Sequence, residues 1–161
     1  QRFGPPELCF PDYESDLPGA VIGAYGKGKA IYVPRHADAL YYRDSLPHTR
    51  TFLTDLVARN IPAAPAKVEG LGALELTVQT QPKTGKILVH LVNYSGQRNN
   101  LYEDVPALHG LRLGVRGVAG DGMALVAGQA VTPKGTPDKD GYQWYALPPV
   151  EAFEAIQFSA Q

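Results

Sequence analysis

The spacing of apolar residues changes along this chain, and that change constrains the fold more than any other feature. Between residues 45 and 60 the apolar side chains recur every three or four residues, which is the period of an α-helix. From residue 74 onward they recur every second residue, which is the period of a β-strand. A proline- and alanine-rich stretch at residues 61–66 separates the two patterns. We therefore predict two domains, over residues 1–62 and 66–161, joined by a short linker.

The first domain is predicted to contain a β-hairpin and one helix. Residues 21–25 and 30–33 are rich in β-branched and aromatic side chains, and the glycine-bracketed turn between them favours a hairpin. A phosphate-binding loop is the alternative, but the Walker spacing and a following helix are missing. The helix is expected over residues 45–60, with Ser45 as N-cap and Pro47 in the first turn. One hairpin and one helix do not close an α/β layer, so this part either lacks the rest of its layer or packs on another body.

The second domain is predicted to be all-β. Residues 87–92 are apolar on both faces, as in a strand that is covered on both sides. No helical pattern of useful length follows residue 60, and Gly and Pro separate the strand-like runs. The fold class is therefore α+β, mainly an antiparallel β-sandwich preceded by a partial α/β segment. The expected strands cover residues 74–79, 87–92, 111–118, 122–131, 142–147 and 151–158.

Composition and charge argue against several kinds of partner and cofactor. The 161 residues include 15 Lys and Arg against 16 Asp and Glu, a formal charge of −1, so no nucleic-acid footprint is expected. No apolar run approaches the roughly 18 residues of a membrane span. A single cysteine excludes an internal disulfide and a Cys-based zinc cluster. None of the four histidines pairs at helical i,i+4 spacing. We expect no metal, no other cofactor, no nucleic acid and no membrane as partner.

A polar cluster, Arg35, His36 and Asp38, follows the predicted strand at residues 30–33. Residues just beyond a strand end in an α/β sheet often face a ligand crevice. The alternative, which we favour, is a loop that caps the helix or contacts a neighbouring domain, because placement at a strand end is a hint at the level of the fold alone.

The acidic residues do not form a recognisable catalytic pair. Glycoside hydrolysis needs two carboxylates on either side of one bond. Glu103 and Asp104 are adjacent and would point apart in an extended chain. Glu151 and Glu154 are expected to be exposed strand positions. We therefore predict no catalytic residue in this chain.

Aromatic side chains are the remaining binding candidates. Tyr41 and Tyr42 are placed in the loop before the helix, and Tyr94 and Tyr102 flank a polar loop at residues 95–100. Exposed rings of this kind would stack on sugars. Tyr142 and Trp144 share one face of their strand, which is also how a sandwich core is filled, and we favour core filling for Trp144. The candidate carbohydrate contacts are Arg35, His36, Asp38, Tyr41, Tyr42, Tyr94, Tyr102 and Trp144.

Several short motifs carry a resemblance to a known family. In the first domain they are GPPE at residues 4–7, PGAV at 18–21, YGKGKAIYVP at 25–34 and LYY at 40–42. This set resembles the end of the trimerisation domain of bacterial β-galactosidase-type glycoside hydrolases. The runs VHLVNYSG at 89–96 and LPPVEAFEAI at 147–156 are similar to the first hairpin and the closing strand of the β-sandwich that follows that domain.

The resemblance implies a flavodoxin-like α/β tail over residues 1–62 and a C-terminal β-sandwich over residues 66–161. It implies a non-catalytic accessory region, structural or oligomerising, whose catalytic carboxylates belong to an upstream TIM barrel of the parent chain. The segment from Arg35 to Tyr42 would match the rim of the active site. We expect this chain alone to be no enzyme, and the parent protein to be a glycoside hydrolase that forms homo-oligomers. The first residues read as the middle of a longer protein, and no compartment is assigned.

A second function stays open at this point. The aromatic content of the predicted sandwich is also typical of a carbohydrate-binding module. Its contacts would be drawn from Tyr94, Tyr102, Tyr142, Trp144 and Tyr145.

Overall fold

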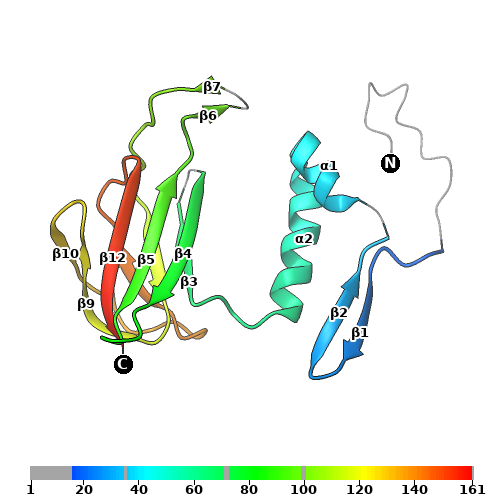
Figure 1. Cartoon of the computed structure of the whole chain (residues 1–161), viewed down its shortest axis with the longest axis horizontal. Coiled ribbons are helices and arrows are strands. Elements are labelled where there is room, and N and C mark those ends of the chain that lie inside the picture. Colours follow the sequence, from blue (N-terminus) through cyan, green and yellow to red (C-terminus); the bar gives the residue numbers. More distant parts are fainter. Residues whose placement is uncertain (1–15, 35, 71–72, 99–100, 161) are drawn as a thin grey trace. The chain divides into compact units, whose positions relative to one another are not determined.

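The computed structural model describes residues 16–34, 36–70, 73–98 and 101–160. The chain divides into two compact units, residues 1–63 (unit 1) and 64–161 (unit 2) (Figure 1). Unit 1 holds the two helices, and unit 2 is built of strands. None of the helices in the described part of the chain combines the length and the apolar character needed to cross a membrane. The predicted α+β class with a dominant antiparallel sandwich is confirmed.

Unit 1 begins with the predicted β-hairpin. Strands β1 (Val21–Tyr25) and β2 (Gly28–Tyr32) pair antiparallel, with Tyr25 opposite Gly28. Two residues therefore form the turn, and the first of them, Gly26, has φ +57°. A two-residue turn of this kind matches the right-handed twist of the strands but needs positive φ, which glycine adopts at little cost. The glycines thus serve the hairpin.

The helical part of unit 1 differs from the prediction at its start. A first helix, α1 (Ala37–Asp44), contains Tyr41 and Tyr42, so placing these residues in a loop was wrong. Ser45 ends α1 in the left-handed region with φ 49°, and its N–H donates to the Tyr41 carbonyl at 2.8 Å. It is therefore not the N-cap of the next helix, α2 (Pro47–Asn60), whose N-cap is Leu46. The prediction of a proline in the first turn of α2 is confirmed. Proline suits this position because the N–H that it lacks would have no partner at a helix start.

Unit 2 is a sandwich of two antiparallel sheets. The larger sheet has the order β10-β9-β12-β5-β4, and the smaller has the order β11-β8-β3. Strand β5 pairs with β4 on one side and β12 on the other, as its apolar sequence predicts. The strands of the larger sheet are β4 (Leu74–Thr80), β5 (Ile87–Asn93), β9 (Val118–Ala124), β10 (Gln129–Val131) and β12 (Phe153–Ala160). Those of the smaller sheet are β3 (Ala66–Glu69), β8 (Arg112–Val115) and β11 (Gln143–Ala146).

Two stretches of unit 2 turn where the sequence predicted one element. The strand expected over residues 122–131 is the hairpin of β9 and β10. The loop expected over residues 95–100 contributes to a small hairpin of β6 (Gln97–Arg98) and β7 (Leu101–Tyr102). Gly128 in the turn between β9 and β10 has φ +67°, so a local glycine signal was present there.

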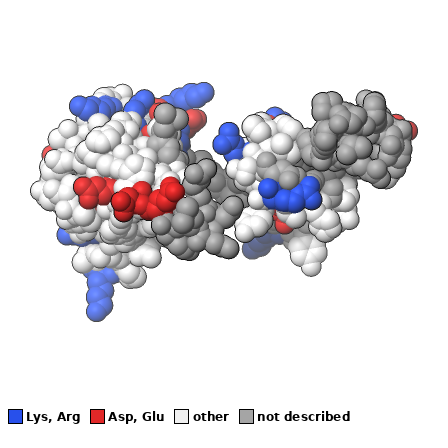
Figure 2. Space-filling view, turned by 90° about the horizontal axis from the view of Figure 1, so that it is seen from above, with Lys and Arg blue, Asp and Glu red and all other residues white. Residues whose placement is uncertain are grey.

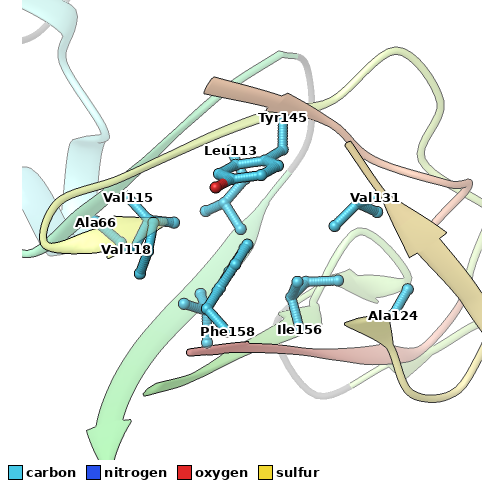
Figure 3. Close-up of a cluster of buried hydrophobic side chains, with 10 residues drawn as sticks. Ala66, Leu113, Val115, Val118, Ala124, Val131, Tyr145, Ile156 and Phe158 are labelled. Carbon is cyan, nitrogen blue, oxygen red and sulfur yellow. The ribbon is translucent and has the colours of Figure 1, made fainter. Parts of the chain in front are cut away.

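The core lies between the two sheets (Figure 3). The rings of Tyr145 and Phe158 meet with centroids 4.7 Å apart, and the Tyr145 hydroxyl donates to the Gly120 carbonyl at 2.9 Å. Burial raises the pKa of the Tyr145 hydroxyl. Gly122 packs under the Phe158 ring so closely that an added Cβ would lie 2.8 Å from Cδ1 of that ring. Only glycine fits this position of β9 without moving the core.

Two buried polar side chains of the larger sheet form hydrogen bonds with the backbone of loops. Asn93, at the end of β5, donates from Nδ2 to the carbonyls of Pro106 at 2.9 Å and Glu151 at 2.6 Å. Glu154, on β12, is 2% exposed, so the expectation of an exposed position was wrong. Its carboxylate accepts from the N–H groups of Val126 at 2.9 Å and Ala127 at 3.0 Å, which form the turn after β9. A buried carboxylate needs such donors in place of water.

Candidate functional site

A row of side chains crosses the outer face of the smaller sheet. Lys67 on β3 and Trp144 on β11 both lie opposite Gly114 on β8, so these three residues share one face. The indole lies flat over Gly114, since an added Cβ there would be 3.2 Å from three of its ring atoms. The Nζ of Lys67 lies 4.9 Å and the Cζ of Arg112 lies 4.8 Å from the Trp144 ring centre. These are cation–π distances.

The loop between residues 135 and 141 holds this row through Asp138. Its Oδ2 accepts from the Trp144 indole N–H at 2.9 Å, and its Oδ1 accepts from the Tyr142 N–H at 3.0 Å. Lys67 Nζ lies 3.6 Å from the same carboxylate. The backbone N–H of Tyr142, followed by the indole of Trp144, lowers the pKa of Asp138 to about 2. The carboxylate is therefore charged throughout the ordinary pH range.

Trp144 and Tyr142 are consequently covered rather than open. Trp144 is 7% and Tyr142 is 5% exposed. Lys67 also lies 4.0 Å above the Tyr142 ring, whose hydroxyl donates to the Ala64 carbonyl at 2.7 Å. Trp144 is buried, but the prediction that it fills the sandwich core was wrong, because it lies under this cation-rich outer face and Tyr145 on the opposite face fills the core. None of these three rings presents an open face for a sugar to stack on.

Among the sandwich tyrosines whose side chains the structure describes, Tyr94 is the exposed one. It follows β5, is 44% exposed, and its hydrogen bond to Glu75 together with the charge of that residue raises the pKa of its hydroxyl. A partly exposed aromatic ring beside a carboxylate has the groups that a polyol needs, an apolar surface and a hydrogen-bond acceptor. Tyr102 lies on β7, but its side chain is outside the described part of the structure.

The candidates of unit 1 gather at the start of α1. His36 is the N-cap residue and is exposed, and Asp38 stands exposed in the first turn. Tyr41 is half-buried and Tyr42 is 92% exposed. Arg35 lies outside the described residues. The structure thus places His36 and Asp38 within one helical turn and leaves the Tyr42 ring almost wholly in solvent.

The carboxylates considered for catalysis differ in their burial. Glu103, Asp104 and Glu151 are exposed, whereas Glu154 is buried and committed to backbone donors. In the part of the chain that the structure describes, no group of three or more His, Cys, Asp or Glu is placed to hold a metal ion. Charge on the face seen in Figure 2 is mixed, with a short acidic row on unit 2 and basic side chains elsewhere.

Sequence reasoning missed the aromatic stack on the outer face of the larger sheet. The rings of His90 on β5 and Phe153 on β12 stack with centroids 5.9 Å apart and planes 25° from parallel. Phe153 pairs with Val92, and His90 lies two residues before Val92 on β5, so His90 and Phe153 are diagonal neighbours on one face. The apolar character of both faces of residues 87–92 was the available signal for this surface.

Comparisons with known proteins place the fold and leave the family open. No protein-family model matches the chain, and no curated protein does. Among solved structures, the chain is similar to the alpha-L-fucosidase isoenzyme 2 of Paenibacillus thiaminolyticus, with a TM-score of 0.65 and 16% sequence identity. The similarity covers 99% of this chain and 25% of the fucosidase chain, so this chain spans a quarter of the length of the protein it matches. At that identity the likeness establishes a common fold.

Proposed function

We propose that this chain is a non-catalytic accessory region of a larger glycoside hydrolase. Its role is structural and oligomerising, and the segment from Arg35 to Tyr42 borders the active site of the parent enzyme. The observation that carries the proposal is the apolar surface of unit 1, which stays strongly exposed in the part of the unit that the structure describes.

The hairpin of unit 1 is apolar on both faces. Its pairing puts Val21, Tyr25 and Tyr32 on one face, and these are 49%, 81% and 66% exposed. Ile22 and Ile31, on the other face, are 49% and 37% exposed. A strand pair that is apolar on both sides is typical of a sheet covered by protein on both sides. A hairpin by itself is at best marginally stable in water.

Helix α2 has the same character. None of its described residues is buried, although Leu53 and Leu56 are half-buried and Phe52 and Val57 are 36% and 54% exposed. A helix gains most of its stability from packing its apolar stripe against another element. We therefore infer that a further protein surface covers these side chains, and we assign it to the remainder of a flavodoxin-like layer in the parent chain.

The comparison supports the class of the parent. The similar solved structure is named as a fucosidase, and three quarters of its chain lie outside the shared region. Under the proposal, that remainder supplies the catalytic carboxylates, and the parent of this chain cleaves glycosidic bonds. The trimerisation-type character of unit 1, and with it a homo-oligomeric parent, rests on the motifs at residues 4–42.

The test compares the chain with its parent. Purified chain is expected to release no nitrophenol from aryl fucosides, galactosides or glucosides, whereas the full-length parent hydrolyses at least one of them. A mock purification from the same host controls for contaminating glycosidase. Turnover by the chain that survives repurification would contradict the proposal, as would a full-length protein without glycosidase activity.

A carbohydrate-binding module is the second candidate function, and the exposure of Tyr94 beside Glu75 favours it. Calorimetric titration with oligosaccharides tests it, using Tyr94→Ala as the binding variant. Tyr25→Ala, which removes a tyrosine of unit 1 that is still more exposed (81% against 44%), is the matched control. Absence of heat at about 10 mM sugar would exclude this candidate, since a dissociation constant above that concentration means a binding free energy weaker than about −3 kcal/mol.

A further inference from the structure

Strand β5 has an apolar outer face that the sandwich does not cover. Val89 and Leu91 point into the core and are fully buried. Leu88, His90 and Val92 alternate with them and are only half-buried, on the outer face of the larger sheet. In an antiparallel sheet with one side in water, alternation between apolar and polar side chains is expected. The outer side of β5 departs from that rule.

Neighbouring strands extend this surface. Gln157 pairs with Leu88 and Met123, and Ala155 pairs with His90, so side chains of β12 and β9 continue the same face. Apolar side chains along it are strongly exposed, and the His90–Phe153 stack stands among them. We define the outer patch as Leu88, His90, Val92, Met123 (42% exposed), Leu125 (48%) and Phe153 (41%).

The chemistry of the outer patch indicates a polypeptide partner. The patch contains no Lys, Arg, Asp or Glu, and its polar border on this side is the edge strand β4, with Glu75, Thr77 and Gln79 exposed. The centre of a protein–protein interface is depleted of charge and enriched in aromatic residues and Met, inside a polar rim. The uncharged groups on this face that can form hydrogen bonds are few: the amide of Gln157, which lies between Leu88 and Met123, and the imidazole of His90.

We infer that the outer patch is the surface through which the sandwich docks onto the rest of its own parent chain. This inference rests on the proposed function and adds the contact surface to it. The occupant is a segment of the same polypeptide, because three quarters of the similar fucosidase chain lie outside the region shared with this chain. An intramolecular partner also needs little affinity of its own, since the linkage supplies a high effective concentration.

Photo-crosslinking in the full-length parent tests the inference. A benzophenone amino acid replaces Phe153, and the matched control places it at Ala146, an exposed strand residue of the smaller sheet. Mass spectrometry is expected to find cross-links from position 153 to parent residues outside this chain within the same polypeptide. Cross-links to a second copy, or equal yields from positions 153 and 146, would overturn the inference.

A double variant, studied in the full-length parent and in the 161-residue chain, separates docking from folding. Phe153→Glu combined with Leu125→Glu is expected to raise the rate of proteolysis between the sandwich and the rest of the parent about tenfold, because charge enters an apolar interface. In the 161-residue chain the same substitutions lie in solvent and are expected to leave the unfolding midpoint almost unchanged. An unchanged proteolysis rate would contradict the docking surface.

The two levels of the hypothesis fail differently. A mature protein of only this length, or a longer one with no glycosidase activity, would overturn the proposed function and the docking surface with it. A longer, active glycosidase that gives no specific cross-link from position 153 would overturn the docking surface alone.

Discussion

Replacement of Glu154 by alanine is expected to destabilise the sandwich strongly, although sequence patterning places this residue on the surface. Its side chain is 2% exposed and accepts three backbone N–H groups, from Val126, Ala127 and Ala155, at 2.8–3.0 Å. Two of these donors belong to the turn that joins β9 to β10. The carboxylate therefore closes a turn that has no cap of its own.

The magnitude follows from the number and kind of these bonds. A hydrogen bond to a charged group contributes about 1.5–3 kcal/mol, and a buried donor left unpaired costs a similar amount. Val126 and Ala127 are exposed residues, so water can replace part of what their N–H groups lose. We expect Glu154→Ala to lower the free energy of unfolding by about 2–4 kcal/mol, and Glu154→Gln, which keeps one acceptor oxygen, by about 1–2 kcal/mol.

Urea unfolding of the 161-residue chain measures this loss. Trp144 is the sole tryptophan of the sequence, so its fluorescence reports on the sandwich and not on unit 1. With a typical slope of about 1–3 kcal/mol per molar urea, Glu154→Ala is expected to move the midpoint down by about 1–2 M. The matched control is Glu151→Ala, an exposed glutamate three positions earlier. Equal midpoints for the two variants would refute the reasoning.

Three further predictions concern other positions of the sandwich. Gly122→Ala is expected to lower stability by about 1–3 kcal/mol, because its Cβ would overlap the core beneath it, and a midpoint at or above that of wild type would contradict this packing. The pKa of Asp138 is lowered to about 2, so its contribution to stability is present above its ordinary pKa and is lost as the pH falls toward 2. Asp138→Asn is expected to reduce this loss of stability at acid pH, measured as the unfolding midpoint from Trp144 fluorescence. An unchanged dependence of the midpoint on acid pH would contradict the role of the Asp138 carboxylate. Glu75→Gln is expected to lower the pKa of Tyr94 toward its ordinary value in an NMR titration of the tyrosine ring carbons, and a pKa that does not move would exclude the pairing.

The sequence was sufficient for elements whose signals are local. The hairpin of β1 and β2 follows from two β-branched runs around Gly26, β4 follows from strict alternation, and β5 follows from a short run that is apolar on both faces. The body of α2 follows from helical spacing and from Pro47 at its start. Helix α1 was missed because a single eight-residue segment with two adjacent tyrosines has no clear apolar period.

For the candidate site, the sequence named residue types but could not assign their surroundings. It grouped Tyr142 with Trp144 on one face, and the structure keeps that grouping on the outer side, under Lys67. Tyr145, one position away, points into the core instead. A period of two fixes which side chains share a face, but it does not say which face the second sheet covers.

The sequence of residues therefore determined the local elements and the apolar character of both sides of β5. Only the tertiary structure decided that Glu154 is buried, that Trp144 lies beneath cations and that one side of β5 remains open. The physical reason is that propensity and period act between neighbours in sequence. Burial depends on contacts between residues far apart in the chain, such as Glu154 with Val126 and Trp144 with Lys67.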